Sequence, residues 1–267
     1  MRLHHCRDAR SLRVVWTLEE IGLLDGSFAH ENNGYELITL PFPPRALHRP
    51  FMKQNMLGTV PLFEHSPDTG AAAAAGAPRL LGEATAMTES CAIPLWLLSQ
   101  YRGGVSAVAS LGVDPHEPDY HEFLNWLFHA DATLTFPQTV VLRYTLQEPG
   151  RADHAAVDYA RWYLARLRKL DAALADGREY LVADRFTVAD ICVTYALFIG
   201  TTLQLEDAPI ATRYKPQTGA YLERMMARPG WLAAQAAQER GEEAFERIAQ
   251  APSGEDGGGG GQQRSKL

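Results

Sequence analysis

Three short segments of the N-terminal part carry groups that could bind or activate a small molecule. The first, Cys6-Arg7-Asp8-Ala9-Arg10-Ser11, lies between an expected strand and an expected helix. A thiolate at a helix N-terminus meets oriented N–H groups, which lower its pKa. Arg10 adds a permanent positive charge, while Ser11 is the expected N-cap, a role that could commit its hydroxyl to the helix. This segment is suited to stabilising an anion.

The second segment is Thr59-Val60-Pro61, at the start of an expected strand. A proline in this position has no N–H to give to the sheet. If the peptide bond before Pro61 is cis, Val60 turns its backbone N–H and C=O outward, where they can pair with an extended peptide. The alternative is an ordinary proline that begins a strand.

The third segment is Glu89-Ser90, which follows a short strand and opens a helix. Free N–H groups and the helix dipole favour a carboxylate there. Ser90 can add a hydroxyl donor and Glu89 can bind an ammonium, so the pair suits an amino-acid head group that carries both charges. The alternative is a plain helix N-cap.

A fourth motif stabilises a helix and has no expected catalytic role. Thr187 and Asp190, three residues apart, predict a capping box, and Phe186 and Ile191 are spaced for a hydrophobic staple.

The elements expected around these segments divide the chain in two. Strands are expected at 1–5, 36–40, 60–64 and 80–81, and helices at 11–22 and 89–101. In the first helix, Arg13, Thr17 and Glu20 fall on one face and apolar residues on the other, with Gly22 as the expected stop. The low-complexity segment 66–78 is expected to be an expanded hairpin loop.

Everything from Tyr120 to Ala249 is expected to be helical, because apolar residues recur there at helical spacing. One stripe comprises Phe123, Leu124, Leu127 and Phe128, and another comprises Tyr159, Trp162, Tyr163, Leu167 and Leu170. The predicted organisation is an α/β domain, a linker, an all-helical domain and a flexible tail, at 1–102, 103–118, 119–250 and 251–267.

The bulk composition is that of a globular protein, with 46 % apolar and 21 % charged residues. The three widely spaced cysteines predict neither a disulfide framework nor a metal site. A net charge of −7 argues against nucleic acid as the main partner. We also expect no membrane span and no secretory signal, because long apolar runs are absent and Met1 leads directly into polar residues.

The expected tail ends in Ser265-Lys266-Leu267 after a run of glycines. This tripeptide is read by the peroxisomal import receptor. In a eukaryotic cell we therefore expect the protein in peroxisomes or a related microbody, and otherwise in the cytoplasm.

Four of these motifs, in this order, resemble those of glutathione transferases. They are Arg10-Ser11-Leu12-Arg13 with Leu18-Glu19-Glu20-Ile21-Gly22-Leu23, Leu57-Gly58-Thr59-Val60-Pro61-Leu62, Met87-Thr88-Glu89-Ser90-Cys91-Ala92-Ile93, and residues 186–191. The resemblance covers roughly residues 1–250 and is strongest to bacterial, beta-like members. It implies a thioredoxin-like α/β N-terminal domain followed by an all-α domain.

The resemblance also implies glutathione as co-substrate and a homodimer. By this resemblance, the backbone of Val60, next to Pro61, would pair with the cysteinyl part of glutathione. Glu89 and Ser90 would hold the γ-glutamyl group. The thiol of bound glutathione would attack a hydrophobic electrophile.

The first segment departs from the family pattern, because Arg10 stands where beta-like members carry cysteine. Our hypothesis is that Arg10 and Ser11, with the helix N–H groups, lower the pKa of the glutathione thiol. Cys6 could instead be a redox thiol or a buried structural residue. The basic residue usual before the strand is also missing, so Lys53 or His48 could hold the glycyl carboxylate, although a solvated lysine is the simpler interpretation.

His129 is a candidate for the second-substrate pocket, because its helix is expected to face the first domain. Two alternatives to the transferase remain open. One is a glutathione-dependent reductase or isomerase, and the other is a non-catalytic binding module with the same fold.

Overall fold

The computed structural model describes residues 1–25, 34–66, 85–100 and 106–250. The expected loop at 66–78 (beyond Ser66), the strand expected at 80–81 and the C-terminal tail lie outside these residues.

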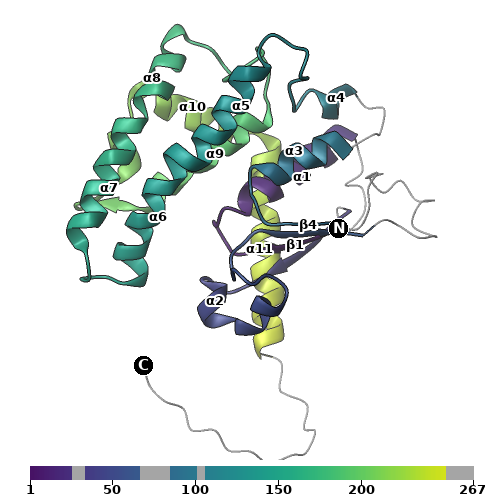
Figure 1. The fold of residues 1–267 in the computed structure, drawn as a ribbon, viewed down its shortest axis with the longest axis vertical. Coiled ribbons are helices and arrows are strands. Elements are labelled where there is room, and N and C mark those ends of the chain that lie inside the picture. Colours follow the sequence, from purple (N-terminus) through teal and green to yellow (C-terminus); the bar gives the residue numbers. More distant parts are fainter. Residues whose placement is uncertain (26–33, 67–84, 101–105, 251–267) are drawn as a thin grey trace, which may run out of the picture.

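A four-stranded mixed sheet forms the centre of the N-terminal part (Figure 1). Its strands are β1 (Arg2–His5), β2 (Glu36–Thr39), β3 (Leu62–His65) and β4 (Thr85–Met87), in the spatial order β2-β1-β3-β4. β2 is parallel to β1, whereas β3 is antiparallel to both β1 and β4. This arrangement confirms the predicted α/β fold.

Helices cover both faces of this sheet. α1 (Leu12–Asp25) and α3 (Ala92–Gln100) lie on one face, whereas α2 (Pro44–Leu47) and a 3-10 turn (Arg49–Lys53) lie on the other (Figure 1). The prediction that α1 stops at Gly22 is wrong, because the helix runs on to Asp25. One glycine costs a helix only about 1 kcal/mol, and Gly22 is buried by surrounding structure.

The rest of the described chain is mostly helical, as predicted. Its main helices are α5 (Tyr120–Phe128), α6 (Phe136–Leu142), α7 (Asp153–Arg166), α8 (Arg168–Ala173), α9 (Val188–Thr202), α10 (Pro216–Met226) and α11 (Pro229–Gln250), preceded by the short α4 (Ser106–Ala109). The expectation of helix throughout is wrong at 177–187, which is not helical, and where β5 (Gln204–Leu205) and β6 (Ala208–Pro209) form a small hairpin.

Two wide π-helical segments interrupt the long path from α5 onward. The first, η4 (His129–Thr135), joins α5 to α6, and the second, η5 (Arg143–Gln147), follows α6. π-helical turns are rare and often accompany functional sites.

The predicted capping box at the start of α9 is confirmed. The Thr187 hydroxyl accepts a bond from the backbone N–H of Ala189, and Asp190 accepts one from the backbone N–H of Thr187. Residues 188–197 of α9 are all buried, so this helix forms the centre of the helical part.

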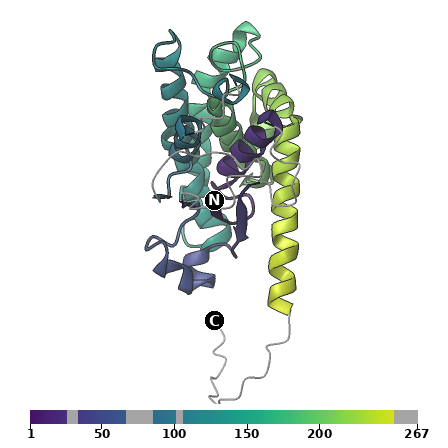
Figure 2. The same ribbon diagram turned by 90° about the vertical axis from the view of Figure 1, so that its right-hand side faces the viewer.

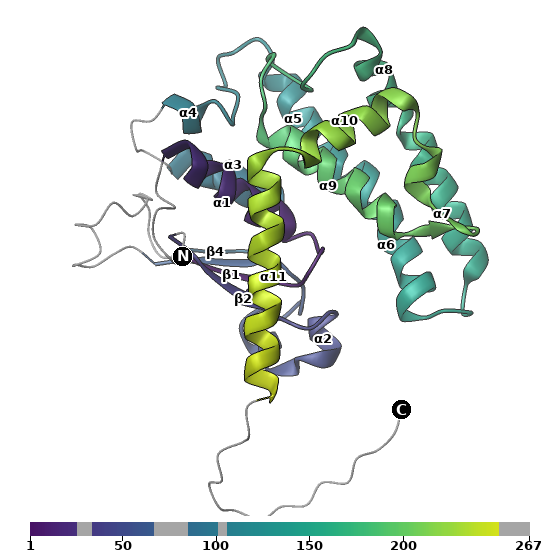
Figure 3. The ribbon, with the colours of Figure 1, turned by 180° about the vertical axis from the view of Figure 1, so that it is seen from behind.

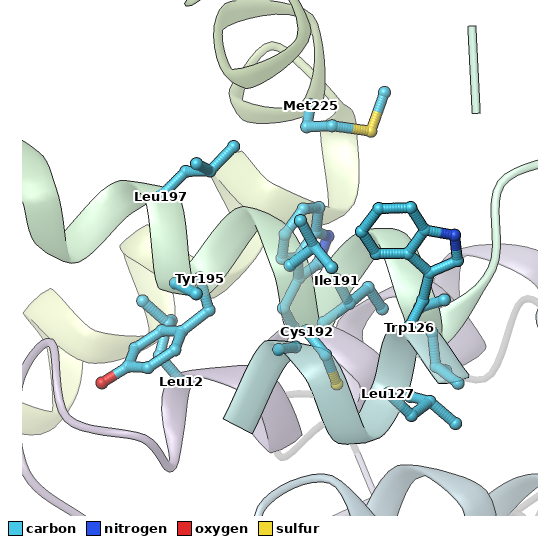
Figure 4. Packing of buried hydrophobic residues seen from close by; sticks show 14 of the residues in the cluster. Leu12, Trp126, Leu127, Ile191, Cys192, Tyr195, Leu197 and Met225 are labelled. Atoms are coloured by element: carbon cyan, nitrogen blue, oxygen red, sulfur yellow. The ribbon is translucent and has the colours of Figure 1, made fainter. Parts of the chain in front are cut away.

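The two halves share one apolar core. Figure 4 shows Leu12 of α1 near Tyr195, Ile191 and Cys192 of α9, and all four belong to the same buried cluster. The predicted apolar stripes contribute to this core, but Phe128 and Trp162 do not, because they are 69 % and 38 % exposed.

The last helix returns to the N-terminal sheet. α11 contacts α1 and β2, and it lies across them when the molecule is seen from behind (Figure 3). Figure 2 shows the same helix running along one side of the molecule. Within the described ranges, none of the helices combines the length and apolar character needed to span a bilayer.

Candidate active site

The strand register brings the three predicted segments to one edge of the sheet. His4 of β1 pairs with Leu62 of β3, so the loop that follows β1 meets the residues that precede β3. Phe63 of β3 pairs with Met87 of β4. Continuing this antiparallel register places Val60 and Pro61 beside Glu89 and Ser90.

The peptide bond between Val60 and Pro61 is cis. Pro61 is buried and Val60 is half-buried. Because β3 begins at Leu62, the N–H and C=O of Val60 precede the ladder of described strand pairs. These backbone groups are thus placed beside the first turn of α3.

Glu89 and Ser90 differ sharply in exposure. Glu89 is exposed, and its C=O accepts the backbone bonds from Ala92 and Ile93 that begin α3. Ser90 is buried, and its Oγ accepts a hydrogen bond of 2.9 Å from Arg13 Nη1.

Arg13 is the central residue of a buried network that the sequence analysis did not single out. Its side chain is fully buried, and Nη1 also donates to Asp131 Oδ1 at 2.7 Å. Nη2 donates to Thr135 Oγ1 at 2.6 Å and to the Ala130 C=O at 3.4 Å. The Tyr195 ring packs against the guanidinium, 4.6 Å from Cζ to the centroid.

The polar face of α1 is buried. Arg13, Thr17 and Glu20 do share a face, but all three are buried because that face meets the helical half. Glu20 accepts two bonds from Arg228, at 3.0 and 3.1 Å.

Arg10 lies at the more open end of the same network. Its Nη1 is 3.7 Å from Asp131 Oδ1, and its side chain is 34 % exposed. Burial of Asp131 opposes its ionisation, but the positive charges of Arg13 and Arg10 outweigh this effect and hold the pKa of the carboxyl below its usual value. Arg10 is therefore a cation that solvent or a ligand can reach.

The Ser11 hydroxyl does not reach solvent. It is fully buried, and its Oγ lies 2.8 Å from His5 Nδ1. Burial lowers the pKa of His5 to about 4, so the imidazole is neutral near pH 7. Ser11 precedes α1 and its C=O accepts the N–H bonds of Val14 and Val15. Its role in chemistry stays a prediction.

Cys6 is buried, which favours a structural residue over a redox thiol. Its side chain is fully buried, with Sγ 3.7 Å from the Pro41 C=O. Burial raises the pKa of this thiol to about 12, so almost no thiolate forms at neutral pH.

The helix α11 fixes the loop that carries these residues. Gln238 Oε1 accepts a bond of 2.9 Å from the Asp8 backbone N–H, and Arg7 forms an ion pair with Glu242. Asp8 has a left-handed backbone, with φ of 55°. The loop conformation therefore depends on a helix more than two hundred residues away in the chain.

Two predicted binding residues do not join this cluster through any contact in the described residues. Lys53 is exposed at the end of the 3-10 turn, and His48 is half-buried beside it. The role of Lys53 stays a prediction.

His129 packs against an aromatic residue of α5. Its ring packs edge-on against Trp126 at 5.4 Å. Burial, followed by the charges of Lys169 and Arg166, lowers the pKa of His129 to about 4. The residue of η4 that pairs with Arg10 and Arg13 is Asp131, and the role of His129 in a pocket stays a prediction.

Cys91 is a further group that the sequence analysis did not assign to the site. It follows Ser90 and is half-buried. A hydrogen bond with Cys192, aided by the positive charges of Arg13 and Arg10, lowers the pKa of the Cys91 thiol despite burial. Among the described residues, no group of three or more His, Cys, Asp or Glu side chains could hold a metal ion.

Comparison with known proteins identifies both the helical domain and the whole fold. Residues 163–229 match the family model described as glutathione S-transferase, C-terminal domain. No protein with a curated function matches the chain.

Several solved structures share the fold over most of the chain. A sphingomonad glutathione S-transferase complexed with glutathione is 23 % identical, with a TM-score of 0.66, covering 90 % of this chain and 99 % of its own. The glutathione transferase URE2P6 from Phanerochaete chrysosporium, in complex with oxidized glutathione, is 19 % identical, with a TM-score of 0.68 and coverages of 90 % and 96 %. A beta class enzyme from Sphingomonas chungbukensis is 21 % identical, with a TM-score of 0.65 and coverages of 89 % and 98 %.

Proposed function

We propose that the chain is a member of the glutathione S-transferase superfamily that binds glutathione and activates its thiol, which the match of residues 163–229 and the shared fold support. The observation that carries this proposal is the register of β1, β3 and β4. It brings the Arg10 loop, Val60 and the Glu89-Ser90 turn to the same edge of the sheet.

Glutathione would lie along this edge as an extended peptide. The backbone N–H and C=O of Val60, outside the described ladder, would pair with its cysteinyl part. Glu89, which is exposed, would bind the γ-glutamyl ammonium, and Ser90 would donate to the adjacent carboxylate. Lys53 is the candidate for the glycyl carboxylate.

Arg10 is the better candidate for thiol activation. It is partly exposed beside Asp131, whereas the Ser11 hydroxyl is buried against His5. The Arg10 charge and the N-terminal N–H groups of α1 would stabilise the thiolate and thus lower the pKa of the thiol. The thiolate would then form a bond to an electrophilic carbon, which releases its leaving group.

Binding and its geometry can be tested by calorimetry. Glutathione should bind the wild type, and both Glu89→Gln and Ser90→Ala should weaken it about tenfold, as expected for loss of a charge-assisted hydrogen bond of about 1.5 kcal/mol. The matched control Glu122→Gln, on α5, should leave affinity unchanged. Equal affinity in all four proteins would contradict the proposed site.

A non-catalytic binding module is the second candidate function. Two observations favour it. Arg10 stands where beta-like members carry cysteine, and the Ser11 hydroxyl is buried. Such a module would bind glutathione without lowering the thiol pKa. Reduction through Cys6 is disfavoured by the raised pKa of that thiol.

Two further partners remain proposals. A homodimer is one, and the exposed Met56 and Leu57 could form an apolar contact between its subunits. Analytical ultracentrifugation at micromolar concentration would detect the dimer.

Peroxisomal import through Ser265-Lys266-Leu267 is the other. It predicts that a fluorescent fusion bearing this terminus enters the peroxisomes of a eukaryotic host. Deleting Leu267 should return the fusion to the cytosol, and unchanged location would contradict the proposal.

A further inference from the structure

Arg13 determines how the Ser90 hydroxyl is oriented, because it donates a hydrogen bond to Ser90 Oγ. A guanidinium is a donor only, so Ser90 Oγ must act as acceptor in the 2.9 Å bond from Nη1. The single hydroxyl hydrogen of Ser90 is then left to donate in another direction. A serine without this partner could rotate and either donate or accept.

Arg13 cannot easily leave this position, because acceptors surround it. Asp131 Oδ1 and Thr135 Oγ1 take bonds of 2.7 and 2.6 Å, and Thr135 in turn donates to the Ala130 C=O at 2.7 Å. All three acceptors lie on the π-helical segment η4. The widened turn places them together against α1.

From these contacts we infer that Arg13 is a positioning residue: it occupies one acceptor site of Ser90 Oγ and directs the hydroxyl hydrogen toward the ligand, so that this subsite favours a carboxylate. The inference rests on the proposed function, in which the carboxylate is the α-carboxylate of the γ-glutamyl group. Arg13 is buried behind Ser90, so it acts through the serine rather than by touching glutathione.

The inference predicts a selectivity that can be measured with two probes. One is glutathione, and the other is the analogue in which the γ-glutamyl α-carboxylate is a carboxamide. An amide offers only a neutral oxygen as acceptor, and a serine whose hydroxyl hydrogen points at the ligand bonds more strongly to a charged carboxylate. The wild type should bind glutathione at least tenfold more tightly than the analogue.

Arg13→Lys is the informative variant, because it keeps the positive charge but loses the planar fork of donors. Its selectivity for glutathione over the amide should fall at least threefold. Ser90→Ala should also lose the selectivity for glutathione over the amide. The double variant, Arg13→Lys with Ser90→Ala, should lose no more selectivity than Ser90→Ala alone. This non-additivity is the mark of a residue that acts through another.

Arg228→Lys is the matched control. Arg228 also joins the helical half to α1, through its two bonds to Glu20, and is not bonded to Ser90 in the described structure. Both arginine variants should lower Tm, but only Arg13→Lys should change selectivity. If Arg13→Lys does not fold, Thr135→Val is used instead, because it removes one hydrogen-bond acceptor of the Arg13 guanidinium. It should also reduce the selectivity for glutathione over the amide.

Unchanged selectivity in Arg13→Lys, or in Thr135→Val if that variant replaces it, would overturn the inference while leaving glutathione binding intact. An equal loss in Arg228→Lys would overturn it as well, since it would show a general effect of loosening the two halves. Failure of the wild type to bind glutathione at all would overturn the proposed function, and the inference with it.

Discussion

Arg13 and Asp131 join the two halves of the chain through a hydrogen-bonded ion pair, with 2.7 Å between Nη1 and Oδ1. Arg13 belongs to α1, and Asp131 to the π-helical segment η4. Because Arg13 is fully buried, water does not solvate its positive charge, and the carboxylate of Asp131 compensates for that loss.

Asp131→Asn should therefore destabilise the fold. Removing one partner leaves the buried guanidinium with a weaker acceptor, and the free energy of unfolding should fall by about 1–3 kcal/mol. Urea denaturation at pH 7 measures this change, with Asp158→Asn on the exposed face of α7 as control. Equal stability of the two variants would show that the pair contributes little.

The buried His5 predicts a pH dependence of stability. Burial lowers the pKa of His5 from 6.5 to about 4. Between these two pH values, the imidazole of the unfolded chain is protonated and that of the folded protein is neutral. The contribution is present in full above pH 6.5 and is lost as the pH falls to about 4. At about 1.4 kcal/mol for each pKa unit, it amounts to about 3 kcal/mol.

His5→Gln should flatten the fall of unfolding free energy between pH 6.5 and 4, since it removes this titration. The exposed His121→Gln is the control and should keep the wild-type slope. Parallel slopes for His5→Gln and the wild type would contradict the assignment.

The three cysteines should differ in reactivity. Cys91 is half-buried with a lowered thiol pKa, whereas Cys6 is fully buried with a raised one and Cys192 is fully buried. Iodoacetamide at neutral pH should label Cys91 first, as read by peptide mass spectrometry. Glutathione should slow this labelling, because Cys91 follows Ser90; faster labelling of Cys6 would be inconsistent with the described burial.

The sequence predicted the backbone-level features of the site well. Thr59-Val60-Pro61, Glu89-Ser90 and the capping box at Thr187 are local patterns, because each depends on neighbours in the chain. The register of β1, β3 and β4 then brings the first two together.

Features that depend on distant contacts were not predicted. Arg13 shares a helical face with Thr17 and Glu20, and such a face ordinarily meets solvent. Its burial arises from Asp131, 118 residues away in the chain. The π-helical segment η4, which brings Asp131 to Arg13, was likewise not predicted, because the sequence analysis expected an ordinary helix there.

The activation of the thiol is the central claim of this account. The most direct measurement follows the ultraviolet absorbance of the thiolate against pH for glutathione bound to the wild type, to Arg10→Ala and to Ser11→Ala. We predict a thiol pKa at least one unit below that of free glutathione, a rise toward the free value in Arg10→Ala, and a smaller rise in Ser11→Ala. Bound glutathione with an unshifted pKa in the wild type would contradict the transferase mechanism and favour the binding module.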